Sequence, residues 1–191
     1  MMSTSALERN QAARRRRVLD AALTLAAQGG FDGVQMRDVA AEADVAIGTV
    51  YRYFASKERL LLEANVEQVE ALHGRLRDRP PTGDTPADRV VEVLRRATRA
   101  LQRNPEVTAA MVRALGTARP EEADAVERVK AAMTAIITGA MHAGIPSERE
   151  VAISRVLQQV WFSALIGWVG GVDPTDRVGD DLEIATRLLL E

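Results

Sequence analysis

The stretch that most constrains the fold is residues 34–62, which holds two short helical patterns separated by a break. Apolar side chains of the first pattern recur at helical spacing, at Met36, Val39, Ala40 and Ala43. The pattern breaks at Asp44–Val45, and a second short helix is predicted over 46–53, with Val50 and Phe54 one turn apart. Two short helices joined by a tight turn form a helix-turn-helix, which places its second helix in the major groove of DNA.

The second of these helices resembles the DNA-binding signature of the TetR family of transcriptional regulators. The resemblance is carried by Gly48-Thr49-Val50-Tyr51-Arg52-Tyr53-Phe54, followed by Ser56-Lys57 and Leu60-Leu61. It implies a homodimeric regulator that binds double-stranded DNA at a palindromic operator and is released by a small-molecule effector. An isologous dimer also suits two recognition helices spaced one groove turn, ~34 Å, apart.

Helical signatures continue along the chain, and no segment alternates apolar and polar residues as a strand would. Caps, prolines and glycines delimit predicted helices at about 11–28, 36–43, 46–53, 56–76, 86–103, 105–115, 120–143, 147–169 and 174–190. The fold class is therefore all-α with nine helices, a three-helix helix-turn-helix head on a larger helical body. We expect a disordered N-terminus over 1–9, a DNA-binding domain over 10–55, and a ligand-binding and dimerisation domain over 56–191.

Composition favours a cytoplasmic protein without a membrane anchor. The 191 residues are 47% hydrophobic and include no cysteine, and no apolar run is long enough to span a membrane. The N-terminal segment, which contains Arg14–Arg17, lacks the apolar core of a signal peptide. Residues 1–57 carry 8 Lys and Arg against 6 Asp and Glu, whereas 58–191 carry 17 against 21. A mildly basic head on an acidic body suits DNA binding.

The second helix of the motif should place Val50 and Phe54 inward and leave its N-terminal end exposed. Gly48 would let the backbone approach the bases, Thr49 could hydrogen-bond a base or phosphate, and Ile47 could contact a thymine methyl group. The expected DNA-contacting residues are Gln35, Arg37, Ile47, Gly48, Thr49, Tyr51, Arg52, Tyr53 and Lys57.

Tyr51, Tyr53 and Lys57 resemble the family positions that bind phosphates and fix the register on DNA. The alternative is that the two tyrosines are only packed aromatic residues. Gln35 and Arg37 begin the preceding helix, where free backbone N–H groups favour a phosphate. Of Arg14–Arg17, one or two side chains should approach phosphates, since four consecutive residues surround a whole helical turn; a solvated face is the alternative.

The helices predicted at 147–169 and 174–190 are more apolar than one core face requires. By resemblance, they should pair with their two-fold mates in a four-helix dimer interface. Large apolar and methionine side chains of the body would also surround a cavity for a hydrophobic ligand, although a plain core is the alternative. The predicted pocket residues are Met111, Leu115, Met133, Ile137, Met141, Trp161, Leu165 and Trp168.

A finer resemblance connects the chain with the KstR-type repressors of steroid (cholesterol) catabolism. It is carried in the body by residues 100–105, Thr108, 110–111, 113–114, Trp161, Ser163 and Trp168, and in the head by 35–37, 43–46 and 52–54. It implies an effector that is a coenzyme A thioester of a steroid. Arg95, Arg99 and Arg103 form one helical row that could bind the coenzyme's phosphates, or could simply face solvent.

Nothing in the sequence favours an enzyme. The two histidines, His73 and His142, lack the partner spacing of a metal site or a serine triad, and we expect no metal and no cofactor. Two other functions stay open: a TetR-type regulator that responds to fatty acyl-CoA or drug-like efflux substrates, and a ligand-sensing dimer without DNA binding. The amino-acid sequence does not specify the operator, the regulated genes or whether the regulator represses or activates.

Overall fold

The computed structural model describes residues 2–191 of the chain, with side chains from residue 8 onward. Within this range the chain forms nine α-helices and one short 3-10 turn, and no strand, so the all-α prediction is confirmed. The elements are α1 (Met2–Gly33), α2 (Met36–Glu42), α3 (Ile47–Tyr53), α4 (Lys57–Asp78), α5 (Pro86–Gln102), α6 (Pro105–Gly116), η1 (Pro120–Glu122), α7 (Ala123–Met141), α8 (Glu148–Val169) and α9 (Arg177–Leu190).

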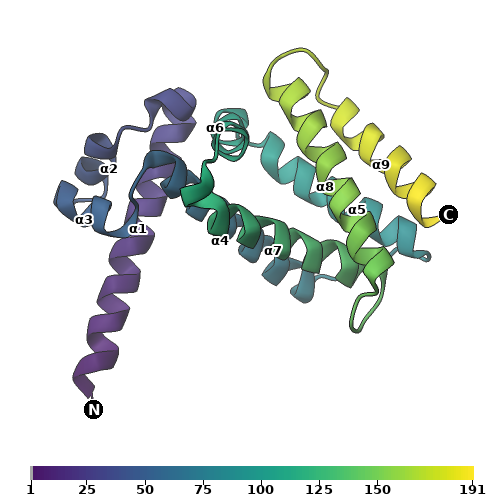
Figure 1. Cartoon of the computed structure of the whole chain (residues 1–191), viewed down its shortest axis with the longest axis horizontal. Coiled ribbons are helices and arrows are strands. Elements are labelled where there is room, and N and C mark those ends of the chain that lie inside the picture. The colour runs from purple at the N-terminus through teal and green to yellow at the C-terminus, as the bar shows by residue number, and fades with distance from the viewer. Residues whose placement is uncertain (1) are drawn as a thin grey trace.

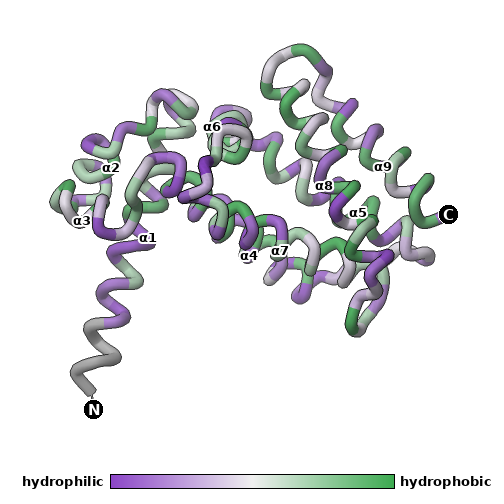
Figure 2. The backbone as a smooth tube through the Cα atoms, in the orientation of Figure 1, coloured by the Kyte–Doolittle hydropathy of each residue, from purple (hydrophilic) through white to green (hydrophobic). Residues whose placement is uncertain are grey.

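The helices form a small head at one end of an elongated body (Figure 1). Helices α2 and α3 lie beside the middle of α1, whose N-terminal half extends away from the rest. Helix α4 runs from the head into the body, and α8 and α9 lie side by side at the opposite end. Figure 2 shows hydrophobic residues alternating with hydrophilic ones along the body helices. None of the helices within 2–191 is long and apolar enough to cross a membrane.

Local capping explains where most helices begin. The Thr85 and Ser147 hydroxyls each accept a hydrogen bond from the backbone N–H three residues on. In turn, the Asp88 and Glu150 carboxylates accept hydrogen bonds from the backbone N–H groups of Thr85 and Ser147. These are the reciprocal bonds of a capping box. Ser56 caps α4 in the same way by accepting from the backbone N–H of Arg59 at 3.0 Å.

Two predicted helix starts are wrong. Helix α1 begins at Met2, whereas the sequence predicted a helix from about residue 11; Met1 lies outside the described residues. Extending an existing helix by one residue is far easier than nucleating one, which permits this extension. Helix α9 begins at Arg177 rather than near Pro174, because the backbone N–H of Asp173 bonds to the Gly167 carbonyl and closes the preceding loop.

The glycine pair predicted to end the first helix produces a sharp kink instead of a complete stop. Gly30 has φ +59° and ψ −153°, a conformation that residues with a Cβ rarely adopt, and a Cβ there would lie 3.2 Å from a Glu106 carboxylate oxygen. One more helical turn then continues to Gly33. The kink positions Phe31 and Val34, both buried, beneath the helix-turn-helix.

The head has no core of its own. Its buried residues form one cluster with apolar side chains of α4, α6 and α7, and α1 packs directly against α6. The shared members from the body are Leu60, Leu61, Leu62, Ala64, Val107, Ala110, Met111, Ala114 and Ala125. A second core joins α4, α5, α7, α8 and α9, with Leu94, Ile137, Leu157 and Leu182 almost completely buried. Head and body are therefore mechanically connected.

Candidate DNA-binding surface and ligand cavity

The turn between α2 and α3 has the tight geometry of a helix-turn-helix. Asp44 adopts φ +51°, a left-handed conformation that aspartate tolerates better than most residues. The backbone N–H of Val45 donates to the Ala40 carbonyl at 3.0 Å and closes the turn. Val50 and Phe54 are 0% and 1% exposed, and they fix α3 against the head core.

This packing leaves the opposite side of α3 exposed to solvent. Ile47 and Tyr51 are 42% and 53% exposed, although both are large and apolar or aromatic. Gly48 and Arg52 are exposed beside them, and a Cβ at Gly48 would meet no atom within 4 Å. Four of the residues predicted to contact DNA therefore share one accessible surface at the recognition helix.

The other five predicted DNA-contacting residues differ in their solvent exposure and in their hydrogen bonds to the protein. Arg37 is exposed, and Thr49 is half-buried. The Gln35 amide donates to the Asp32 carbonyl at 3.0 Å. The Tyr53 ring is half-buried and its hydroxyl lies 3.5 Å from the carbonyl oxygen of Gln11, so the packing alternative applies better to Tyr53 than to Tyr51.

Lys57 has a second role at the base of the head. Its Nζ donates to the Phe31 carbonyl at 3.2 Å and lies 4.1 Å from the centroid of the Phe31 ring. Arg113 of α6 lies 4.3 Å from the same centroid. Phe31 is thus held by two cations, an arrangement that stabilises the junction of head and body.

The run from Arg14 to Arg17 divides into two pairs. Arg15 and Arg16 point toward α4, where they form ion pairs with its carboxylates. Arg14 and Arg17 are exposed and form no ion pair with the described residues. This division leaves at most two of the four side chains for phosphates, in line with the expectation that not all can face DNA.

A prediction follows from the contrast between Tyr51 and Tyr53. Tyr51→Ala should weaken operator binding about tenfold or more at fixed salt, because the Tyr51 ring is 53% exposed on α3 and its hydroxyl forms no hydrogen bond with the described residues, which leaves it available for a phosphate. Lys57→Ala should also weaken binding but lower the melting temperature as well, through the loss of its contacts with Phe31. Fluorescence anisotropy on labelled operator and thermal unfolding measure both effects; unchanged affinity in Tyr51→Ala would contradict the assignment.

A buried carboxylate connects the head with α7, and sequence reasoning missed it. Glu63 of α4 is only 5% exposed. It accepts hydrogen bonds from Arg15 of α1 at 2.8 Å, from Arg59 at 2.9 Å, and from Arg128 of α7. Burial alone would raise the pKa of Glu63, but the hydrogen bond and charge of Arg128 and the charges of Arg59 and Arg15 together lower it.

The network extends to both sides of Glu63. Arg59 forms a bidentate pair with Asp124 of α7, at 2.6 and 2.7 Å. Arg15 reaches Glu67 at 2.5 Å, one turn further along α4. The spacing of Arg59, Glu63 and Glu67 by four residues was visible in the sequence, but the partners on α1 and α7 depend on the tertiary fold.

A partly open cavity of about 1100 Å³ lies in the body. Its walls come from α4, α5, α6, α7 and α8, and the α7–α8 loop contributes Gly144 and Pro146. Five predicted pocket residues line it: Met111, Leu115, Met133, Trp161 and Leu165. The volume is within the range of small-molecule sites or slightly above it, which suits a large ligand.

Three predicted pocket residues do not line this cavity. Ile137 and Met141 are buried in the second core, and Trp168 packs against the same core from the C-terminal end of α8. Helical spacing showed that these residues face inward but not which part of the interior each one meets. The helix packing directs them into solid core instead.

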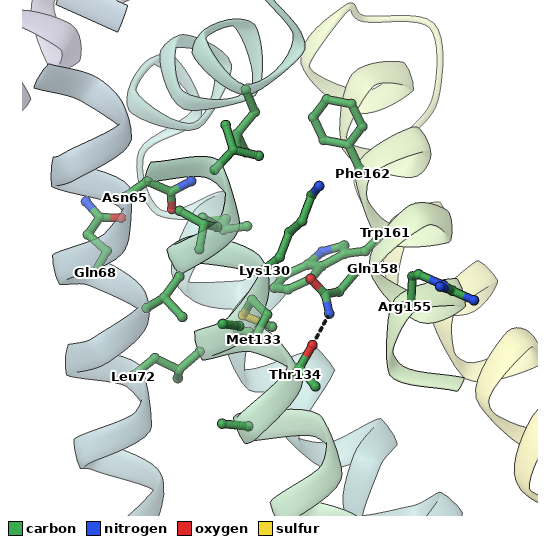
Figure 3. Close-up of a pocket in the computed structure, with 18 of the residues that line it drawn as sticks. Asn65, Gln68, Leu72, Lys130, Met133, Thr134, Arg155, Gln158, Trp161 and Phe162 are labelled. Atoms are coloured by element: carbon green, nitrogen blue, oxygen red, sulfur yellow. Dashed lines mark hydrogen bonds between the residues drawn. The ribbon is translucent and has the colours of Figure 1, made fainter. Parts of the chain in front are cut away.

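Polar residues of the cavity wall were absent from the predicted set. Figure 3 shows Asn65, Gln68 and Leu72 of α4 on one side and Trp161 and Phe162 of α8 on the other, with α7 between them. The polar and charged lining residues include Asn65, Gln68, Arg75, Lys130, Thr134, Arg155 and Gln158. Arg75, Lys130 and Arg155 are exposed and lie at the rim of the cavity, whereas Asn65 is buried. Helical periodicity assigns polar residues to the solvent side, so the burial of Asn65 at the cavity was not apparent.

The predicted arginine row does not reach the cavity. Arg95 points toward α9, where it forms an ion pair with Glu183. Arg99 and Arg103 are exposed, and neither lines the cavity. On the same helix Ala97, Ala100 and Leu101 face the cavity, so the arginines occupy the other side of α5.

An exposed recognition helix joined through α4 to a cavity-containing helical body is the arrangement of a ligand-responsive transcriptional regulator. Residues 18–64 match the family model of bacterial regulatory proteins of the tetR family, and residues 83–189 match that of the tetracyclin repressor-like C-terminal domain. The chain belongs to the TetR family.

Curated relatives match nearly the whole chain. It is 41% identical to the HTH-type transcriptional repressor KstR of Rhodococcus jostii and 40% identical to that of Mycolicibacterium smegmatis. Each comparison spans 180 residues, 94% of this chain, and covers 84% and 88% of the respective relative. The resemblance to KstR-type repressors is therefore confirmed at the level of sequence.

Solved structures of the family share the fold. A TetR regulator from Rhodococcus sp. RHA1 has a TM-score of 0.88 at 34% identity and covers 95% of this chain and 97% of its own. FadR of Thermus thermophilus, solved in complex with lauroyl-CoA, has a TM-score of 0.70 at 22% identity, covering 93% of each chain. The second likeness is one of fold alone.

Proposed function

We propose that this chain is a homodimeric repressor of lipid or steroid catabolism genes, released from its operator by a hydrophobic effector such as a steroid coenzyme A thioester. The observation that carries the proposal is the shared position of α4, which forms a wall of the cavity and also anchors the head. The KstR relatives are named as repressors, and FadR of Thermus thermophilus was solved with an acyl-CoA. The proposed activity requires a cytoplasmic location, with the DNA.

The charges of the cavity wall favour an amphipathic effector over a purely apolar one. Arg75, Lys130 and Arg155 are exposed at the rim of the cavity, where Lys130 pairs with Glu127 at 3.8 Å, and apolar side chains such as Leu72 and Met133 line its interior. Cations at the wall could pair with the phosphates of a coenzyme while the apolar part is buried. These three residues replace the arginine row of α5 as candidates for that role.

Effector binding would act through α4. A ligand that separates α4 from α7 or α8 would strain the contacts of Arg59 with Asp124 and of Glu63 with Arg128. Because Arg15 joins the head to Glu63, the head would then move relative to the head of the partner subunit. A ligand can cause this change only by binding the released state more tightly than the DNA-bound state.

The test is a mobility shift of the protein on DNA upstream of its own gene, with and without a steroid coenzyme A thioester. We expect a shifted band that the thioester releases and that neither the free steroid nor a fatty acyl thioester releases. Release by the fatty acyl thioester would favour the fatty acyl alternative. Absence of any shift on this or other candidate operators would favour a ligand-sensing dimer without DNA binding.

The proposed dimer interface is the outer face of α8 and α9. Large apolar side chains remain exposed there, with Ile166 at 49%, Ile184 at 58% and Leu188 at 80% exposure. Helix α8 buries its other side, including Leu157 and Trp161, in the body. Large exposed apolar side chains on two adjacent helices of a folded chain support an interaction site here.

A double variant tests the interface. Ile184→Glu with Leu188→Glu should convert the dimer into a monomer at micromolar concentration, because two carboxylates would be buried without partners. Val172→Glu is the matched control, since Val172 is equally exposed at 82% but lies in the loop between the two helices. Sedimentation velocity measures the state; a dimer that survives the double variant would contradict this interface.

A further inference from the structure

The N-terminal half of α1 extends away from the rest of the chain (Figure 1). Its backbone is helical from Met2, every side chain from Glu8 to Arg14 is exposed, and Val18 is the first buried residue among the side chains that the structure describes. A surface helix normally buries one face against a core, and α1 does so only from Val18 onward. The segment before Val18 therefore has a surface available for a partner.

The composition of this segment indicates which kind of partner fits. Residues 8–17 contain five arginines and one glutamate, and their only apolar side chains are those of Ala12 and Ala13. A helix that docks into a protein groove presents large apolar side chains at i, i+3, i+4 and i+7, and residues 8–17 have no such row. A basic helix without an apolar face is complementary to a polyanion such as DNA.

The ion pairs of α1 define which face of the helix is available. Arg15 and Arg16 reach the carboxylates of α4. Successive residues of an α-helix point about 100° apart, so Arg14 and Arg17, which flank this pair, point away from α4, as does Asn10 one turn before Arg14. Arg14 and Arg17 are exposed and form no ion pair with the described residues. The outer face of α1 thus presents two uncompensated guanidinium groups and an amide.

This face continues the surface of the recognition helix. The Tyr53 hydroxyl at the end of α3 lies 3.5 Å from the Gln11 carbonyl oxygen, and the Arg15 guanidinium lies 5.4 Å from the centroid of the Phe54 ring. Residues 11–15 of α1 therefore run beside the C-terminal end of α3. From Gln11 back to Met2 the helix extends about 14 Å further, which corresponds to about four base pairs of DNA.

We propose that residues 2–17 form a second DNA-binding element, which follows the sugar-phosphate backbone beside the base pairs that α3 reads and continues into the DNA that flanks each half-site. Arg14 and Arg17 pair with phosphates, and the helix before them extends the contact outward. Contacts of this kind add affinity and fix position without reading bases. The inference rests on the proposed function, in which α3 of each subunit lies in one half of an operator.

The first experiment removes the two exposed guanidinium groups. Arg14→Gln with Arg17→Gln should weaken binding to DNA upstream of the protein's own gene about tenfold or more. The slope of log K against log salt concentration should fall by about two or more, since each phosphate contact contributes ~0.9 and the dimer carries both changes twice. Arg99→Gln with Arg103→Gln is the matched control, because these arginines are also exposed and without an ion pair among the described residues, but lie at the C-terminal end of α5.

The second experiment measures how far the helix reaches. Duplexes that end at the outermost base pair needed for sequence-specific binding are compared with duplexes extended at both ends by about four base pairs of arbitrary sequence. The natural protein should bind the extended duplex about tenfold more tightly, whatever the added sequence. Ala12→Pro should bind both duplexes equally, because proline removes a helical hydrogen bond and interrupts the extension without changing its charge.

Fluorescence anisotropy measures all affinities, and thermal unfolding checks the fold. The variants of α1 should melt within a few degrees of the natural protein, since the buried side chains of the helix begin at Val18. Equal losses of affinity in the two arginine pairs, or equal binding of both duplexes by the natural protein, would overturn the inference and leave the proposed function standing. Absence of operator binding by the natural protein would overturn both.

Discussion

Gly48→Leu should abolish operator binding, by a factor of about one hundred or more, without unfolding the protein. Gly48 lies in the first turn of α3, exposed, and a Cβ there would meet no atom of the chain within 4 Å. The fold therefore does not require glycine at this position. A leucine side chain would project from the recognition helix and hold its backbone away from the base edges that it must approach.

The matched control is Gly74→Leu. Gly74 lies within α4, and its Cβ position is equally open, but it is far along the chain from the head. Both variants should have melting temperatures within a few degrees of the natural protein, since leucine favours helix over glycine. A Gly48→Leu protein that still binds operator at the natural affinity, measured by fluorescence anisotropy at fixed salt, would exclude α3 as the reading helix.

Glu63→Gln should be the most destabilising single change outside the apolar cores. It removes the charge that Arg15, Arg59 and Arg128 share, and leaves their guanidinium groups facing each other. Loss of one partner from a buried ion pair costs about 3–5 kcal/mol, and partial exposure of the arginines reduces this to about 2 kcal/mol. For a chain of this size the melting temperature should fall by about 4–8 °C.

Glu67→Gln is the control for Glu63→Gln. Glu67 lies one turn further along α4 and also pairs with Arg15, but its side chain is 25% exposed against 7% for Glu63. Its removal should cost less than about 1 kcal/mol, as for other solvent-accessible ion pairs. Equal losses in the two variants, measured by urea denaturation, would mean that burial of Glu63 contributes nothing.

The Glu63 network also predicts a dependence on pH. The pKa of Glu63 is lowered in the fold, so the unfolded chain binds the proton more readily than the native protein does. The extra stability is complete above the pH where an unfolded glutamate titrates, about 4.3, and is lost as the pH falls toward the native pKa. The difference in unfolding free energy between the natural protein and Glu63→Gln should therefore be constant from pH 7 to 5 and shrink below pH 4.3.

Features governed by local chemistry were predictable from the sequence. The caps at Ser56, Thr85 and Ser147, and the break at Asp44, define the helices and the helix-turn-helix within a few residues. Each depends on a few consecutive residues whose backbone hydrogen bonds are satisfied locally. The start of α9 was missed because the backbone N–H of Asp173 bonds to the Gly167 carbonyl, which keeps this segment in the loop after α8.

Features that depend on how helices pack were not predictable in the same way. Met133 and Met141 share one helix and both face inward, yet only Met133 lines the cavity. Arg95 lies on an arginine row, but it is the neighbouring α9 that supplies its partner Glu183. Asn65 gave no signal, because periodicity identifies apolar faces and cannot show that a polar side chain faces inward.

The core shared by the head and α6 limits how this regulator can be divided. Excising residues 1–55 would separate Leu19, Ala22 and Phe54 from the α4 and α6 side chains with which they share one core, and such a fragment would have too little core to fold. A chimera that exchanges operator specificity should therefore carry the head together with α4 and α6. In evolutionary terms, operator choice and effector choice are not independent modules here, because α4 and α6 serve both the head core and the cavity wall.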